Sequence, residues 1–215
     1  MDASSQSRSG IHRLPDKILS SIFLNAINEC DDSAEVAFLP LTLSHTSSRW
    51  REVCVSTSFL WTSIYMSLPY RHNQSTIQNQ LVYLRTWISR SDSSPLNIHL
   101  DFRDPEWDWN EETHRFTSTW ASQIFSIILP HANRWKHIEF IADTWAPIHV
   151  FLAASAANSS ESLQLLESMA LSRCNAYFAR KGELFKPVSL REPVPLFGGA
   201  RLPSLRGLSL AGVHH

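Results

Sequence analysis

The first part of the chain places apolar residues with the period of an α-helix. After Leu14-Pro15 they recur at i, i+3, i+4, i+7 and i+8, which predicts an amphipathic helix with Pro15 in its first turn. These residues are Ile18, Leu19, Ile22, Phe23, Ala26 and Ile27. The segment from Cys30 to Ser33 then breaks the period and is expected to be an acidic loop.

A second short helix is expected to begin at Pro40 and to carry Leu41 and Leu43, because proline interrupts the pattern and fits the first turn of a helix. Ser47 and Ser48 are good N-caps for a third helix. Three helices in roughly 45 residues bury little apolar surface by themselves, so this unit should pack on the rest of the chain.

The third helix has one apolar face with arginines beside it. Arg49 and Arg51 flank Trp50, and their aliphatic stems are long enough to cover the indole ring. The apolar face consists of Trp50, Val53 and Cys54.

After residue 60 the pattern alternates between strands and helices. Residues 60–66 are rich in β-branched and aromatic side chains, and residues 96–102 and 134–140 alternate with period two, so each segment predicts a strand. A short helix is expected over residues 148–157. Two further helices are predicted by helical spacing of Ile77, Leu81, Leu84 and Ile88, and of Phe116, Trp120, Ile124, Ile127 and Ile128. Strands separated by helices predict a parallel sheet with right-handed crossovers.

Residues 163–172 and 202–210 share a spacing of leucines that resembles the strand-bearing part of a leucine-rich repeat. The strand candidates recur every 30 to 40 residues or so, whereas strict repeats of this class span about 20 to 29. A degenerate, curved solenoid and a compact open sheet both satisfy this pattern. Residues 179–200 are expected to form a long loop. The last five residues supply neither a helix nor a polar cap, so we expect the repeat region to be truncated at its C-terminal end.

Composition narrows the classes of function. The formal net charge of the 215 residues is -1, which gives no electrostatic sign of a nucleic-acid binder. No apolar run reaches the roughly 18 residues of a membrane span, and residues 1–10 are typical of a disordered polar tail. Cys30, Cys54 and Cys174 are widely separated, which favours a reducing compartment, the cytosol or the nucleus.

Five short motifs occur in a fixed order in the first 61 residues. They are Leu14-Pro15-Asp16-Lys17-Ile18-Leu19, Ile22-Phe23, Leu41-x-Leu43-Ser44, Arg49-Trp50-Arg51 and Leu60-Trp61. Together they resemble the F-box, and the chain looks most like the F-box proteins abundant in fungi. The resemblance covers about residues 11–65. The chain departs from the family at Lys17, where an acidic residue is frequent, and in the long loop expected over residues 28–38.

The resemblance implies a three-helix F-box unit over residues 11–60, followed by a leucine-rich-repeat-like α/β region over residues 61–215. Because this family often carries such repeats after the F-box, we expect an irregular α/β solenoid with a parallel sheet rather than a compact open sheet. Such a unit binds the Skp-type adaptor of a cullin–RING ubiquitin ligase. Trp50 and Trp61 are then expected to anchor the third helix against the following domain and the internal core. The expected adaptor contacts are Leu14, Pro15, Ile18, Leu19, Ile22, Phe23, Leu41, Leu43 and Arg51.

Few residues are arranged as expected for a catalytic or metal site. Glu111 and His114 are spaced to share a helix face, but a carboxylate-bridged metal site needs a second such pair, so an acidic helix start is the preferred interpretation. Cys54 is expected to be an inert core thiol. Trp107 and Trp109 either pack on the flank of the fold or, if exposed, form a contact for a target protein. No catalytic residue, metal or cofactor is expected.

The sequence therefore predicts an interaction protein, not an enzyme. The F-box unit would bind a Skp-type adaptor, and the repeat region would hold an unidentified target protein for ubiquitin transfer, with no nucleic-acid or membrane partner. Two alternatives remain open. One is a binding protein outside ubiquitin ligation, in which the helical unit is only a structural cap. The other is a small α/β enzyme, which would have a pocket with shifted pKa values at the carboxyl ends of its strands.

Overall fold

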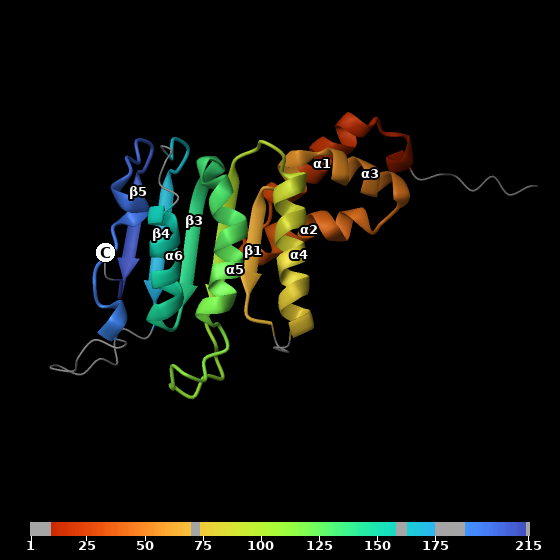
Figure 1. The fold of residues 1–215 in the computed structure, drawn as a ribbon. Helices are drawn as coiled ribbons and strands as arrows, with labels where there is room; N and C mark the ends of the chain where they lie inside the picture. The colour runs from red at the N-terminus through yellow and green to blue at the C-terminus, as the bar shows by residue number, and fades with distance from the viewer. Residues whose placement is uncertain (1–9, 70–73, 158–162, 175–187, 214–215) are drawn as a thin grey trace, which may run out of the picture.

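The computed structural model describes residues 10–69, 74–157, 163–174 and 188–213, and shows three helices followed by a mixed α/β region (Figure 1). Except for Gly10, the expected polar tail lies outside the described residues. The helical part consists of η1 (Gly10–Arg13), α1 (Asp16–Asn28), α2 (Ser33–Ser44), α3 (Ser48–Ser56) and η2 (Ser58–Trp61).

The described residues of the α/β part form one five-stranded sheet. Its elements are β1 (Ser63–Ser67), α4 (Gln74–Arg90), β2 (Leu96–Phe102), α5 (Ser118–Ile128), η3 (Leu129–Arg134), β3 (Trp135–Ala142), α6 (Trp145–Ala157), β4 (Ser168–Arg173), η5 (Val188–Leu190), η6 (Leu196–Gly199) and β5 (Gly207–Ala211). All neighbouring strands are parallel, and they follow one another in sequence order from β1 to β5. The expected parallel α/β sheet is confirmed.

Register-matched positions show how irregular the spacing of the strands is. Ile64, Ile98, Ile138, Met169 and Leu208 lie side by side across the sheet, at sequence separations of 34, 40, 31 and 39. The last two strands continue the same apolar pairing, because Met169 pairs with Leu208 and Leu171 pairs with Leu210. The leucine pattern does not make a strand along its whole length: residues 163–166 and 202–205 form turns, and the strands begin at Ser168 and Gly207.

One face of the sheet packs on α4, α5 and α6, as Figure 1 shows. Strand residues alternate between buried and half-buried, most clearly in β2, where Leu96, Ile98, Leu100 and Phe102 are buried. Buried residues from both parts of the chain, from Leu19 to Phe197, belong to one hydrophobic core cluster. The sheet therefore has one face in the core and one face open.

The start of α2 differs from the prediction. The helix begins at Ser33, not at Pro40, because Asp32 caps it: the Asp32 carboxylate accepts hydrogen bonds from Ala34 N (2.9 Å) and Glu35 N (3.0 Å). Pro40 is buried inside the helix, and the loop expected over residues 28–38 ends before Ser33. Ser47 caps α3 as predicted, by accepting a hydrogen bond from Trp50 N.

Trp61 joins the helical part to the sheet. The sequence placed it in a strand, but it lies at the end of η2, two residues before β1 begins at Ser63, and it is fully buried. Its Nε1–H donates to the carbonyl of Cys54 in α3 at 2.8 Å, and its ring meets Trp87 of α4 edge-on with centroids 4.9 Å apart. The guanidinium of Arg90 lies 4.3 Å from the ring centroid. One side chain thus fixes α3 against α4.

The edge strand β1 has backbone groups that no second strand satisfies, and α4 supplies partners for two of them. Gln80 Nε2 donates to the carbonyl of Ser67 at 2.9 Å, and Tyr65 N donates to the hydroxyl of Tyr83 at 3.4 Å. The edge is therefore protected from pairing with another chain.

Candidate functional site

The open face of the sheet presents three rows of side chains, each running across the strands. The first row is Ser63, Asn97, His137, Ser168 and Gly207; the second is Tyr65, His99, Glu139, Ala170 and Ser209; the third is Ser67, Asp101, Ile141, Ser172 and Ala211. Apart from Ile141 and the small Ala and Gly positions, these residues are polar or carry a polar tip. The face is thus suited to hydrogen bonding rather than to packing against another layer of the same fold.

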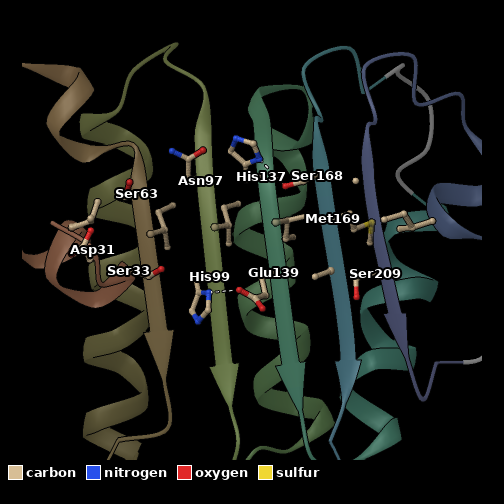
Figure 2. Close-up of a pocket in the computed structure, with 17 residues that line it drawn as sticks. Asp31, Ser33, Ser63, Asn97, His99, His137, Glu139, Ser168, Met169 and Ser209 are labelled. Carbon is tan, nitrogen blue, oxygen red and sulfur yellow. Dashed lines mark hydrogen bonds and ion pairs between the residues drawn. The ribbon is translucent and has the colours of Figure 1, made fainter. Parts of the chain in front are cut away.

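A hollow of about 560 Å³ lies over the first two rows (Figure 2). Its floor comes from β1 to β5, and one side is closed by Asp31, Ser33 and Val36 from the turn between α1 and α2 and the start of α2. The helical part and the sheet therefore build this hollow, called the open-face groove below, together.

Two polar pairs are held on the floor of the groove. His99 Nδ1 lies 2.7 Å from Glu139 Oε2, and Tyr65 stacks on the His99 ring at 5.2 Å with the planes 10° apart. His137 Nδ1 lies 2.7 Å from Ser168 Oγ. Figure 2 shows the His99 and Glu139 side chains meeting between β2 and β3. These contacts fix side chains that would otherwise lose rotamer freedom on binding a partner.

The His137–Ser168 pair has the spacing of a base and a nucleophile, but its surroundings favour a different role. Acyl transfer needs hydrogen-bond donors aimed at a developing oxyanion. Ser168 lies in β4, which pairs with β3 on one side and β5 on the other, so the nearby backbone N–H groups point into the ladders. The pair is better suited to recognition than to catalysis.

A second polar cluster lies at the carboxyl ends of β2 and β3. Asp143 Oδ2 accepts hydrogen bonds from Asp104 N at 2.6 Å and from His114 Nε2 at 3.1 Å. His114 Nδ1 accepts from Phe116 N at 3.0 Å, so the ring proton is on Nε2. The preferred interpretation of residues 111–114 as an acidic helix start is wrong, because they form a turn, and α5 begins at Ser118 after the Thr117 cap with no acidic residue in its first turn. For the same reason Glu111 and His114 do not share a helix face.

The charged groups of this cluster are paired. The Arg115 side chain donates to both oxygens of Asp104, and this lowers the pKa of Asp104 and raises that of Arg115. Burial alone would raise the pKa of Asp101, but hydrogen bonds from the Arg103 side chain and backbone outweigh burial and lower it. These shifts move each group further from neutral pH. They fit a structural ion-pair network better than general acid–base catalysis.

Trp107 and Trp109 lie in the loop between β2 and α5, beside a hollow of about 770 Å³ at the carboxyl ends of the strands. Trp107 packs edge-on against His114, and its Nε1–H donates to Asn110 O at 2.7 Å. Trp109 is 59% exposed, and its φ of 67° lies in the left-handed region. The two rings are 5.4 Å apart. Trp107 therefore packs on the fold, and Trp109 is exposed, so each of the two interpretations of this pair holds for one of its residues.

The structure separates the predicted adaptor residues into two sets. On α1, Ile18 is 47% exposed and Ile22 is 41% exposed, whereas Leu19 and Phe23 are buried in the core. Leu19 and Phe23 therefore cannot serve as surface contacts; the 3.6-residue period turns them inward. Of the others, Pro15 and Arg51 are exposed, and Leu14, Leu41 and Leu43 are half-buried. Trp50 packs on Phe23 with ring centroids 4.8 Å apart.

Arg49 ties the start of α1 to α3. Its Nε and Nη2 donate to Asp16 Oδ1 at 3.1 and 2.7 Å, and Nη2 also donates to the carbonyl of Leu14. The Leu14-Pro15 segment is thus held beside the exposed residues of α1. The sequence placed Arg49 as a cover for Trp50 and did not indicate this link.

Burial raises the pKa of the Cys54 thiol to about 11, which keeps it protonated at neutral pH, as expected for a core thiol. Within the described ranges no group of three or more His, Cys, Asp or Glu side chains is placed to hold a metal ion. None of the described helices is long and apolar enough to cross a bilayer. Comparison of the chain with protein-family models, with curated proteins and with solved structures gives no match.

The groove residues are the ones that sequence reasoning missed. The alternation of polar residues in 96–102 and 134–140 was enough to place His99 and Glu139 on one face of their strands. The alternation did not supply the pairing register of β2, β3 and β4, which brings His99 beside Glu139 and His137 beside Ser168. The wall from Asp31 to Val36 was out of reach, because it depends on how α2 packs beside β1.

Proposed function

We propose that this chain is a substrate-recognition adaptor of a cullin–RING ubiquitin ligase, with its helical part bound to a Skp-type adaptor. The observation that carries the proposal is the division of α1. Leu19 and Phe23 fill the core, while Ile18 and Ile22 stay exposed one helical turn apart, next to Pro15. Exposed aliphatic side chains in this arrangement are typical of a helix that buries a second face against a partner.

The connections inside the helical part support the same function. Arg49 holds the Leu14 carbonyl and Asp16, so the segment that precedes α1 is ordered before any partner arrives. A surface that is already ordered loses less conformational entropy on binding. Trp61 links α3 to α4, which favours a fixed geometry between the adaptor surface and the sheet.

The open-face groove is the proposed surface for the target protein. A parallel sheet in sequence order with helices on one face is the layout of a leucine-rich-repeat solenoid, which supports the repeat interpretation over a compact open sheet. In such a ligase this chain performs no bond chemistry. It raises the effective concentration of the target lysine near the ubiquitin carrier. A site of action in the cytosol or nucleus is part of the proposal.

The test is binding of the full chain to a purified Skp-type adaptor, compared between wild type and the double variant Ile18→Asp with Ile22→Asp. Both positions are exposed, so charge there should weaken adaptor binding by at least tenfold and leave the fold intact. Val82→Asp on α4 is the matched control, because Val82 is an exposed aliphatic side chain on another helix. It should bind like wild type.

The structural-cap alternative predicts a different result. If the helical part only covers the end of the sheet, the exposed Ile18 and Ile22 have no partner to lose. The wild-type chain would then fail to bind the adaptor while showing a native circular dichroism spectrum. That result would contradict the ligase proposal.

A further inference from the structure

The three rows of the open face contain no lysine or arginine, although the chain has 19 of them. The full charges in these rows are the carboxylates of Asp101 and Glu139. Lys136, which precedes the rows in β3, lies 3.9 Å from Glu167, and Arg103, which follows them, is bound to Asp101. Arg103 thus neutralises Asp101 in the third row, whereas no lysine or arginine lines the groove over the first two rows.

The wall of the groove contributes one carboxylate, that of Asp31. Glu29, Asp31, Asp32 and Glu35 are all exposed, and Asp31 lines the groove directly. The Asp32 carboxylate caps α2 and is not part of the groove lining. Carboxylates from the wall and the floor therefore face the same volume of about 560 Å³.

Hydrogen-bond acceptors on the floor are not fully used. Asn97 Oδ1 is buried and has no hydrogen-bond partner among the described residues. Glu139 gives Oε2 to His99, and an ionised carboxylate accepts about four hydrogen bonds in total. Such a floor is complementary to side chains that only donate, and lysine and arginine are the residues that donate without accepting.

From this charge complementarity we infer that the open-face groove binds an extended segment of the target protein that carries lysine or arginine side chains. The basic segment lies across β1 to β3 between the Asp31 wall and Glu139, with the two carboxylates accepting from it. The inference rests on the proposed function in one respect: the occupant of the groove is taken to be a target of the ligase. The groove chemistry can be measured without the ligase.

The experiment is a fluorescence-anisotropy titration of the full chain with a fluorescein-labelled peptide of alternating arginine and serine. Peptides of the same length with glutamate or glutamine in place of arginine are the controls. The buffer is at pH 8, where unperturbed imidazole groups are neutral. We expect the arginine peptide to bind at least tenfold more tightly than either control, and its affinity to fall as salt is raised.

The double variant Asp31→Asn with Glu139→Gln keeps the shapes of both side chains and removes their charges. It should weaken binding of the arginine peptide by about tenfold, since each partly exposed ion pair contributes a few-fold. Glu52→Gln on α3 is the matched control, because Glu52 is exposed and outside the groove lining, and it should bind like wild type.

Equal affinity for the three peptides, or loss of affinity in Glu52→Gln equal to that in the double variant, would overturn the inference. Self-association of the chain that is abolished by the double variant would do so too, since the occupant would be a second copy. The titration contains no adaptor, so failure of peptide binding and failure of adaptor binding are separate results.

Discussion

Replacement of Trp61 by alanine should remove the main link between the helical part and the sheet. The side chain is fully buried, and deletion of a buried tryptophan or phenylalanine costs about 3–5 kcal/mol. Trp61→Phe keeps most of the ring contact with Trp87 and loses the hydrogen bond to the Cys54 carbonyl, so about 1–2 kcal/mol is expected. For a chain of this size, about 4 kcal/mol lowers Tm by roughly 8–16 °C.

Urea and thermal unfolding followed by far-ultraviolet circular dichroism measure both variants. Phe59→Ala is the matched control, because Phe59 lies in the same short helix and is 59% exposed, and it should change stability by less than about 0.5 kcal/mol. Trp61→Ala should also broaden the transition, because the helical part can then unfold separately. A cost for Trp61→Ala no larger than that for Phe59→Ala would refute the role assigned to this residue.

Two further substitutions test other links. Arg115→Met leaves the buried Asp104 carboxylate without its ion-pair partner and should cost about 3 kcal/mol at pH 7 in urea unfolding. The folded pKa of Asp104 lies below its ordinary value of 3.8, so the ion pair stabilises the wild type above that value and its contribution is lost as pH falls through the folded pKa. The free energies of unfolding at pH 7 and pH 3 should therefore differ less in the variant than in the wild type. An unchanged difference would contradict the assignment. Arg49→Leu removes the hydrogen bonds to Asp16 and to the Leu14 carbonyl. Calorimetry should show adaptor binding weakened roughly fivefold, while the free energy of unfolding falls by less than about 1 kcal/mol. Unchanged affinity would show that adaptor binding does not depend on these hydrogen bonds.

The sequence predicted best those elements whose type and bounds follow from a single physical rule, the period of their apolar residues. Residues 96–102 alternate between core and open face, and the strand occupies Leu96–Phe102. Residues 77–88 carry a helical stripe, and α4 covers Gln74–Arg90. The predicted start of α2 was wrong because two rules compete there. Pro40 is typical of a helix start, but Asp32, earlier in the chain, caps the helix by accepting hydrogen bonds from two backbone N–H groups.

The groove depends on relations that no local pattern contains. His137 and Ser168 are 31 residues apart, and the parallel register of β3 and β4 brings them within 2.7 Å. The polar identity of these residues was visible, but irregular strand spacing gave no basis for pairing them. On α1 the helical period placed four apolar residues on one face. Only packing shows that Leu19 and Phe23 face the core while Ile18 and Ile22 do not.

Hydrogen–deuterium exchange of the full chain, with and without a saturating Skp-type adaptor, tests the ligase proposal most directly, because it reports both binding and its location. We expect slower exchange in the peptides that cover Leu14 to Ile22, with the open-face strands β2 and β3 unchanged. The double variant Ile18→Asp with Ile22→Asp should show no such protection. Unchanged exchange across α1 in the wild type, or protection confined to the sheet, would contradict the adaptor surface proposed for this helix.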